Sequence, residues 1–269
     1  MPAVEHRFVA ARGLRLHSLD YGGDGRAVVL VHGVGGTAWV WHRVAPALRA
    51  AGRPLAVDLR GFGLSQRSAE RAYSTEEQAL DLVAVADGLR LEEFDLVGFS
   101  WGALVALAFT ARDDRVRRIA LVDMPPSSRL GETDVNPLPY ASASWAEAVE
   151  GERRIAPRAT EDMLSETASL LTLPTAEGGF VRAIDPFFLE RWPFHSDDHW
   201  ETLRALDRPL LVVRAEQSMA LCVADAERMV AESRDGRLVT IADCGHLVPI
   251  ERPAELASAL CSFLGESAG

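Results

Sequence analysis

Six short apolar runs recur along the chain, with longer stretches of helical pattern between them. They are AVVLVHG (27–33), PLAVDLRG (54–61), FDLVGFS (94–100), RIALVDM (118–124), PLLVVRA (209–215) and RLVTIAD (237–243). Their apolar residues occupy consecutive positions, which is typical of strands covered on both faces. The pattern predicts an α/β fold with a mostly parallel sheet between layers of helices. The first two expected strands, HRFVA and LRLHSLDYG, alternate more clearly, and we expect them to form an antiparallel edge.

Residues 125–205 interrupt this rhythm. Three segments there have a helical pattern, SWAEAVEGERR, EDMLSETASLL and HWETLRAL, and the aromatic stretch DPFFLERWPF lies before the last of them. An insertion at the carboxyl edge of a parallel sheet lies where open α/β folds bind ligands. We therefore expect a core of residues 1–124 and 206–269 with a helical cap of residues 125–205.

Charge and composition narrow the choice of partner. The 269 residues are 48% hydrophobic and carry a net charge of −11, with no block of basic residues, so nucleic acid and anionic membrane are disfavoured. No apolar run approaches the roughly 20 residues that span a bilayer. The amino-terminal residues also lack the pattern of a secretory signal. We expect a cytoplasmic protein that acts on a small molecule, and its oligomeric state stays open.

The segment Gly98-Phe99-Ser100-Trp101-Gly102 matches the pattern G-x-S-x-G. Five residues match by chance often, but here a predicted strand precedes the serine and a predicted helix follows it. That is the setting of a nucleophile elbow, in which glycines allow a strained serine and a close approach of neighbouring chains. The alternative is that Ser100 merely caps the helix.

A nucleophilic serine needs a base and a site for the developing oxyanion. His246, in ADCGHLVPIERP, follows the last predicted strand and is the candidate base; the alternative is a histidine in a surface loop. The glycine-rich turn HGVGG (32–36) follows another strand. The backbone N–H groups of Val34 and Trp101 form the predicted oxyanion hole, and we expect their side chains to face the substrate.

The chain resembles the α/β-hydrolase superfamily of serine hydrolases in four segments, which occur in the order and spacing of that family. They are HGVGG, DLRGFGLS (58–65), GFSWGA and GHLVPIERP. The resemblance extends from residue 27 to about residue 265. It implies an eight-stranded, mostly parallel sheet with a helical cap inserted after the sixth strand. It also implies Ser100 as nucleophile, His246 as base, and no cofactor. Separately, the three cysteines lack the spacing of a zinc site, and we expect no metal.

The third member of the triad is less clear. The family often carries an aspartate in G-x-x-D after the seventh strand, but this chain has Ala215-Glu216-Gln217-Ser218 there. Other members carry the acid after the sixth strand, where this chain has Asp123. Neighbouring strands lie about 4.8 Å apart, so a carboxylate at either strand end can reach the same imidazole. We predict Asp123 as the acid, with Glu216 as the alternative, because a triad is defined by geometry.

Two other segments suggest chemistry. Asp58, Arg60 and Gly61 in DLRGFGLS are better explained as a brace for the loop beside the oxyanion turn. The run 195–199 (HSDDH) resembles a metal cluster, but Asp198 and Glu201 also form a capping box for the helix that follows.

The predicted pocket contains Gly33, Phe187, Phe188 and Trp192. The aromatic residues, with Phe194, have an alternative role in fastening the cap to the core, because pockets and cores favour the same residue types. Since the cap is rich in Phe, Trp and Leu and shows no arginine clamp, we predict cleavage of an ester, thioester or lactone of a small apolar or aromatic substrate through an acyl-enzyme at Ser100.

Three alternatives to this function use the same scaffold. The first is hydrolysis of a carbon–carbon bond or an amide. The second is a non-hydrolytic reaction such as acyl transfer, cyclisation or perhydrolysis. The third is ligand binding without catalysis.

Overall fold

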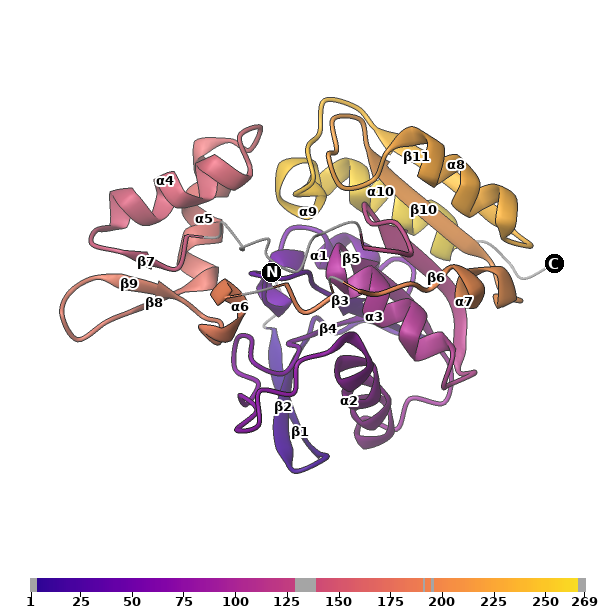
Figure 1. Cartoon of the computed structure of the whole chain (residues 1–269), viewed down its shortest axis with the longest axis horizontal. Helices are drawn as coiled ribbons and strands as arrows, with labels where there is room; N and C mark the ends of the chain where they lie inside the picture. Colours follow the sequence, from indigo (N-terminus) through magenta and orange to yellow (C-terminus); the bar gives the residue numbers. More distant parts are fainter. Residues whose placement is uncertain (1–3, 129–138, 191, 195, 266–269) are drawn as a thin grey trace.

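An eight-stranded sheet runs through the middle of the molecule, with helices on both faces (Figure 1). The computed structural model describes residues 4–128, 139–190, 192–194 and 196–265. In the order in which they lie in the sheet, the strands are β1 (Glu5–Ala11), β2 (Leu14–Asp20), β4 (Arg53–Val57), β3 (Ala27–Val31), β5 (Phe94–Phe99), β6 (Val116–Val122), β10 (Leu210–Ala215) and β11 (Gly236–Ile241).

Strand direction agrees with the sequence pattern. β1 pairs antiparallel with β2, and β2 pairs antiparallel with β4, so the expected antiparallel edge is confirmed. The five remaining pairs of neighbours, from β4 to β11, are parallel. Because the carboxyl ends of these parallel strands share one edge, the loops after β3, β5, β6, β10 and β11 meet there.

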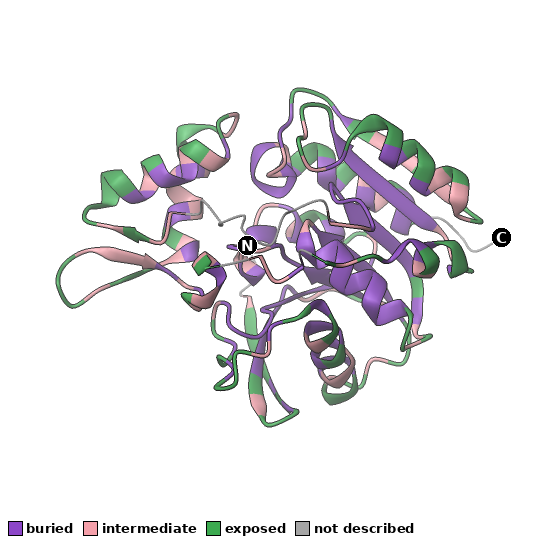
Figure 2. Cartoon of the chain, viewed as in Figure 1, coloured by how far each residue is buried: buried purple, intermediate pink, exposed green. Residues whose placement is uncertain are grey.

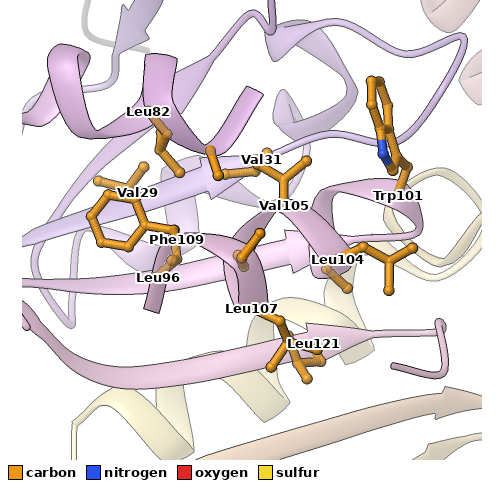
Figure 3. Close-up of a cluster of buried hydrophobic side chains, with 14 of the residues drawn as sticks. Val29, Val31, Leu82, Leu96, Trp101, Leu104, Val105, Leu107, Phe109 and Leu121 are labelled. Atoms are coloured by element: carbon orange, nitrogen blue, oxygen red, sulfur yellow. The ribbon is translucent and has the colours of Figure 1, made fainter. Parts of the chain in front are cut away.

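Two hydrophobic cores cover the two faces of the sheet. One contains α2 (Thr75–Gly88), α3 (Trp101–Thr110) and α8 (Val223–Glu232), and the other contains the short helix Ala38–Trp41, α1 (Ala45–Leu48), α9 (Val248–Glu251) and α10 (Pro253–Leu264). Every residue of α3 is buried. Figure 3 shows part of the first core, where side chains of α3 lie against the sheet. The consecutive apolar residues of the strands are therefore explained by burial on both faces, which Figure 2 shows for the centre of the molecule.

The region after β6 contains β7 (Ala141–Ser142), α4 (Trp145–Ile155), α5 (Glu161–Leu171), β8 (Thr172–Pro174), β9 (Phe180–Arg182), α6 (Phe187–Glu190) and α7 (Trp200–Ala205). The elements from β7 to β9 project beyond the sheet (Figure 1), and we call residues 139–190 the cap. The cap is not wholly helical as expected, because β7, β9 and β8 form a small antiparallel sheet. α7 instead packs against α3 and α8 of the core. The division at residues 125 and 205 stays a prediction.

None of the helices in the described ranges is long and apolar enough to cross a membrane.

Candidate active site

Ser100 lies in the sharp turn between β5 and α3. Its backbone has φ +53° and ψ −128°, a region that L-residues rarely adopt. A Cβ on Gly98 would lie 2.2 Å from the carbonyl oxygen of Gly102, and one on Gly102 would lie 2.4 Å from that of Val31. Glycine is therefore required on both sides of the serine. Ser100 occupies the N-cap position of α3, but its side chain makes no capping hydrogen bond, so capping does not explain the residue.

The hydroxyl of Ser100 is joined to His246. The Oγ atom lies 2.9 Å from His246 Nε2, and His246 Nδ1 lies 2.8 Å from Asp123 Oδ2. An ionised carboxylate accepts but does not donate, so Nδ1 carries the proton and Nε2 is free to accept the proton of Ser100. Three residues far apart in the sequence thus form one hydrogen-bonded series.

Asp123 immediately follows β6 and is fully buried, with φ +55°. The amide of Ala215 donates to Oδ1 over 2.8 Å, and the hydroxyl of Ser218 donates to Oδ2 over 2.6 Å. Glu216, the alternative acid, is exposed, and its Oε2 accepts from the amide of Asp243 over 2.8 Å. Among the described residues, the carboxylate that His246 contacts is therefore Asp123.

The loop that carries His246 is itself held. The buried carboxylate of Glu251 accepts from the amide of Gly245 over 2.6 Å and from the cap amide of Arg158 over 3.3 Å. The ring of His246 lies against that of Phe99, with centroids 5.3 Å apart. Sequence reasoning missed Glu251, although the residue lies in the segment GHLVPIERP that was singled out.

The glycine-rich turn lies directly beside Ser100. A Cβ on Gly33 would lie 2.7 Å from Ser100 Cβ and 3.1 Å from its Oγ, so Gly33 lets the two chains approach. Behind the turn, buried His32 donates from Nδ1 to the carbonyl of Gly33 over 2.7 Å, while its Nε2 accepts from the amide of Leu59 over 3.1 Å. Burial lowers the pKa of His32, which favours this neutral form.

The two predicted oxyanion donors have different surroundings. Within the described part of the chain, the amides of Val34 and Trp101 donate to no acceptor, so both are free to bind an oxyanion. The expectation that the Trp101 side chain faces the substrate is wrong. Its indole is fully buried (Figure 3), donates to Thr75 Oγ1 over 2.8 Å and stacks on Phe194.

The loop 58–65 has the bracing role that the sequence suggested. Asp58 accepts from the amide of Ala38 over 2.5 Å and from that of Leu64 over 2.9 Å. Arg60 pairs with Asp81 in the core, and Gly61, at φ +84°, lies where a Cβ would be 2.8 Å from the ring of Tyr73.

A cavity of about 560 Å³ lies over Ser100 and His246. Its lining is mostly apolar and comes from the core and the cap: Val34, Val40, Phe99, Met124, Pro125, Ile155, Leu171, Trp192, Phe194, Met219, Leu247 and Ile250 are among its residues. Trp192 therefore lies where predicted, and its neighbour Phe194 joins it.

The other three predicted pocket residues do not line this cavity. Phe188 is fully buried, with its ring centroid 4.3 Å from that of Phe62, and Phe187 packs on Tyr73 at 5.0 Å. These two rings fasten α6 to Phe62 and Tyr73 of the core, which is the alternative that the sequence left open. Gly33 is covered by Ser100 itself.

Charged side chains in the cavity were not expected. Glu152 and Arg154 on α4 and Arg182 on β9 all line it. Glu152 and Arg182 form an ion pair with both side chains almost fully buried, and Arg182 also donates to the carbonyl of Gly35 over 2.7 Å. Burial raises the pKa of Glu152, and Arg182 opposes the rise. The sequence contains a signal for the position of Glu152. It is four residues after Ala148 and three before Ile155, so helical spacing places all three on the inward face of α4.

The resemblance of residues 195–199 to a metal cluster gains no support. His195 lies outside the described residues, and those that the structure describes contain no group of three or more side chains able to hold a metal ion. Asp198 Oδ1 accepts from the amide of Trp200 over 3.1 Å, and α7 begins at Trp200 with His199 at the N-cap. The expected capping box with Asp198 at the N-cap is therefore wrong, because the N-cap is His199, whose side chain makes no capping hydrogen bond.

Known proteins share both the sequence pattern and the fold. A model of the alpha/beta hydrolase family matches residues 28–259. The 2-hydroxymuconate semialdehyde hydrolase of Pseudomonas sp. strain CF600 is 29% identical, covering 99% of this chain and 95% of its own. The N-formylmaleamate deformylase of Pseudomonas putida is 30% identical, covering 90% and 89%. Epoxide hydrolase A of Mycobacterium tuberculosis is 29% identical, covering 98% of each.

A solved structure of an alpha/beta hydrolase from Novosphingobium aromaticivorans superposes on this chain with a TM-score of 0.84 at 25% identity. The alignment covers 98% of this chain and 99% of the other.

Proposed function

This chain belongs to the alpha/beta hydrolase family, and we propose that within it the chain is a serine hydrolase that cleaves a carbon–carbon or carbon–nitrogen bond beside a carbonyl group of a small carboxylic acid. The observation that carries the proposal is the hydrogen-bonded series Ser100, His246 and Asp123 at the wall of a cavity that also contains arginine. Ester, thioester or lactone cleavage, the first expectation from sequence, ranks second.

The geometry supports acyl chemistry. His246 takes the proton of Ser100 as Oγ attacks the carbonyl carbon, and the amides of Val34 and Trp101 stabilise the oxyanion. Collapse of the tetrahedral intermediate breaks the carbon–carbon or carbon–nitrogen bond, and the leaving group takes the proton from His246. Water activated by His246 then releases the acyl group from Ser100. A carbon leaving group must be stabilised as an enolate, so a carbon–carbon substrate carries a second, conjugated carbonyl group.

Names of the relatives guide the choice of bond. Two relatives that cover most of this chain are named as a semialdehyde hydrolase and a deformylase, and both names describe acidic carbonyl compounds. The name of the third relative, an epoxide hydrolase, describes a different kind of substrate. Attack of Ser100 on an epoxide would leave an ether on the serine, with no carbonyl for water to attack, so this nucleophile suits carbonyl substrates.

The charges of the cavity support an acidic substrate. Arg182 is neutralised by Glu152. Arg154 makes no ion pair with any residue that the structure describes, whereas the adjacent Arg153 pairs with Glu150 and Glu161. The lining therefore carries a net positive charge in a protein of net charge −11, which favours entry of an anion. An arginine also binds a carboxylate in bidentate geometry.

A substrate panel assayed beside Ser100→Ala tests the proposal. It contains a conjugated 2-hydroxy-6-oxo dienoate, an N-formyl amide of an unsaturated acid, and neutral aryl esters, thioesters and lactones. We expect the wild type to favour an acidic substrate by at least about tenfold in kcat/KM, and Ser100→Ala to lose the activity. Incorporation of one oxygen from labelled water per turnover distinguishes hydrolysis from acyl transfer or cyclisation.

Two matched variants test the arginine. Arg154→Gln should raise KM for the acidic substrate about tenfold, and Arg153→Gln, one residue away on the same helix, should leave KM unchanged. Cleavage of neutral esters alone, or activity that survives in Ser100→Ala, would contradict the proposal.

A further inference from the structure

Ser218 lies in the loop after β10, at the position where the acid of the family is often found. The sequence marks it only as the residue that replaces an aspartate. In the structure it lies beside the acid that is present, because β6 and β10 are neighbours and the ends of these two strands meet. Its Oγ atom is 2.6 Å from Asp123 Oδ2, the same oxygen that lies 2.8 Å from His246 Nδ1.

The direction of this hydrogen bond is fixed by the other partners of the hydroxyl. Ser218 Oγ accepts from the amide of Ala220 over 3.0 Å and from that of Leu221 over 3.1 Å. Both lone pairs of the hydroxyl are then occupied by N–H donors, so its own proton is left for Asp123 Oδ2. The loop thus holds the serine as an obligatory donor toward the carboxylate.

Asp123 receives three donors in all. Ala215 donates to Oδ1, while Ser218 and His246 both donate to Oδ2. A fully buried carboxylate needs such donors to balance its lost hydration. The amide fixes one oxygen, and the serine fixes the rotation of the carboxylate that brings the other oxygen to the imidazole.

We infer that Ser218 is a positioning residue of the catalytic series, which acts through Asp123 to orient His246 and to share the negative charge that His246 faces. The inference rests on the proposed function, because the orientation of His246 matters when it serves Ser100. It explains why this loop lacks a carboxylate but still contacts the triad. A second acid at position 218 would repel Asp123, whereas a hydroxyl stabilises it.

Removal of the Ser218 hydroxyl has two consequences that would not follow if the residue had a structural role alone. The Asp123 carboxylate is freer to rotate, so Ser100 becomes less reactive by about tenfold, the cost of a hydrogen bond to a charged group. Oδ2 also keeps its full negative charge for His246, which stabilises the protonated imidazole. His246 then serves as base only at higher pH, so the acid limb of Ser100 reactivity moves to higher pH.

The test uses the whole protein and needs no known substrate. The rate of reaction of Ser100 with a fluorophosphonate is measured across pH for the wild type, Ser218→Ala and Ser218→Thr. Ser233→Ala serves as the control because it removes a hydroxyl at the carboxyl end of α8, where Ser233 donates to the carbonyl of Val230 over 2.9 Å. We expect slower reaction and an acid limb at higher pH for Ser218→Ala, with the wild-type profile kept by Ser218→Thr and Ser233→Ala.

A second measurement is independent of catalysis. The proton shared by His246 Nδ1 and Asp123 should give a low-field proton resonance that is lost in His246→Gln and is shifted or broadened in Ser218→Ala. Ser218→Cys, which keeps the shape but is a weaker donor, replaces Ser218→Ala if the latter does not fold.

An unchanged resonance, its absence from the wild type, or a lower Tm with an unmoved acid limb overturns the role of Ser218. Failure of the fluorophosphonate to label wild-type Ser100 would contradict the proposed function instead. The low-field resonance of the His246 proton would then still test the role of Ser218.

Discussion

The amide of Ala215 donates to Asp123 Oδ1 over 2.8 Å, so the end of β10 holds the carboxylate that follows β6. An amide at position 123 cannot serve all three donors. If its oxygen accepts from Ala215, its NH2 group faces Ser218 and His246 Nδ1, so Nδ1 must accept a hydrogen bond, and Nε2 carries the proton and cannot take that of Ser100. If its oxygen stays with Ser218 and His246, its NH2 group faces the amide of Ala215, and the negative charge that stabilises the protonated imidazole is lost.

Asp123→Asn should therefore lower kcat by about 10⁴-fold, through the wrong imidazole tautomer or the lost negative charge. Glu216→Gln is the control, because Glu216 contacts the amide of Asp243 and should change kcat little. Steady-state kinetics on an activated ester measures both. A larger loss in Glu216→Gln would reverse the assignment of the acid.

A carboxylate moved to the neighbouring strand end should restore part of this loss. Ser218 Oγ lies 2.6 Å from the Asp123 oxygen that contacts His246, so we expect an aspartate at position 218 to reach the same imidazole. We expect Asp123→Asn/Ser218→Asp to exceed Asp123→Asn by at least about tenfold in kcat. Ser218→Asp alone should be slower than the wild type, because two adjacent carboxylates repel each other. A double variant as slow as Asp123→Asn would show that position 218 cannot supply the acid.

Gly33→Ala should abolish activity without unfolding the protein. The added Cβ would lie 2.7 Å from Ser100 Cβ, which forces the nucleophile or the oxyanion turn to move. Gly36→Ala is the milder comparison in the same turn: its Cβ would lie 3.3 Å from the carbonyl oxygen of Gly33, a tight contact but not an overlap, so labelling should fall less. Fluorophosphonate labelling and circular dichroism together measure the effect. Equal labelling of the two variants would contradict the close packing of Gly33 on Ser100.

The buried ion pair of the cap predicts a dependence of stability on pH. Burial raises the pKa of Glu152 above its ordinary value of 4.5, so the folded protein binds this proton more tightly than the unfolded chain does. The contribution of Glu152 to the free energy of unfolding is therefore greatest below pH 4.5 and falls as pH rises through the raised pKa.

The glutamine of Glu152→Gln does not titrate. The free energy of unfolding of this variant minus that of the wild type should therefore increase as pH rises from 4.5 through the raised pKa of Glu152. Denaturant unfolding at several pH values measures the difference. Glu150→Gln, an exposed change on the same helix, is the comparison, and the slope for Glu152→Gln should exceed its slope. A flat or falling difference for Glu152→Gln would contradict the direction of the pKa shift.

Local sequence was enough to predict the strands and the elbow. The consecutive apolar residues before Ser100 and the glycines at 98 and 102 reflect requirements that arise within a few residues of the chain. The structure contains the strand and the tight turn that they predict. His246 was also identifiable, because it follows the last strand of the sheet and the carboxyl ends of the parallel strands share one edge.

The acid and the pocket could not be predicted as securely, because they depend on which segments meet in space. Asp123 and Glu216 each follow a strand of the sheet, β6 and β10, and the packing of β6 beside β10 puts Asp123 within reach of His246. Phe188 and Trp192 are four residues apart and chemically alike, yet one is in the core and the other in the cavity. Burial alone does not distinguish these two roles.

If Ser100 is the nucleophile activated by His246 and Asp123, it should react with a fluorophosphonate before any other residue does. Intact-mass analysis after brief treatment, followed by peptide mapping, measures this. We expect a single adduct on Ser100 in the wild type, no adduct in Ser100→Ala, and greatly slowed labelling in His246→Gln. An adduct on another residue, or labelling that is as fast without His246, would contradict it.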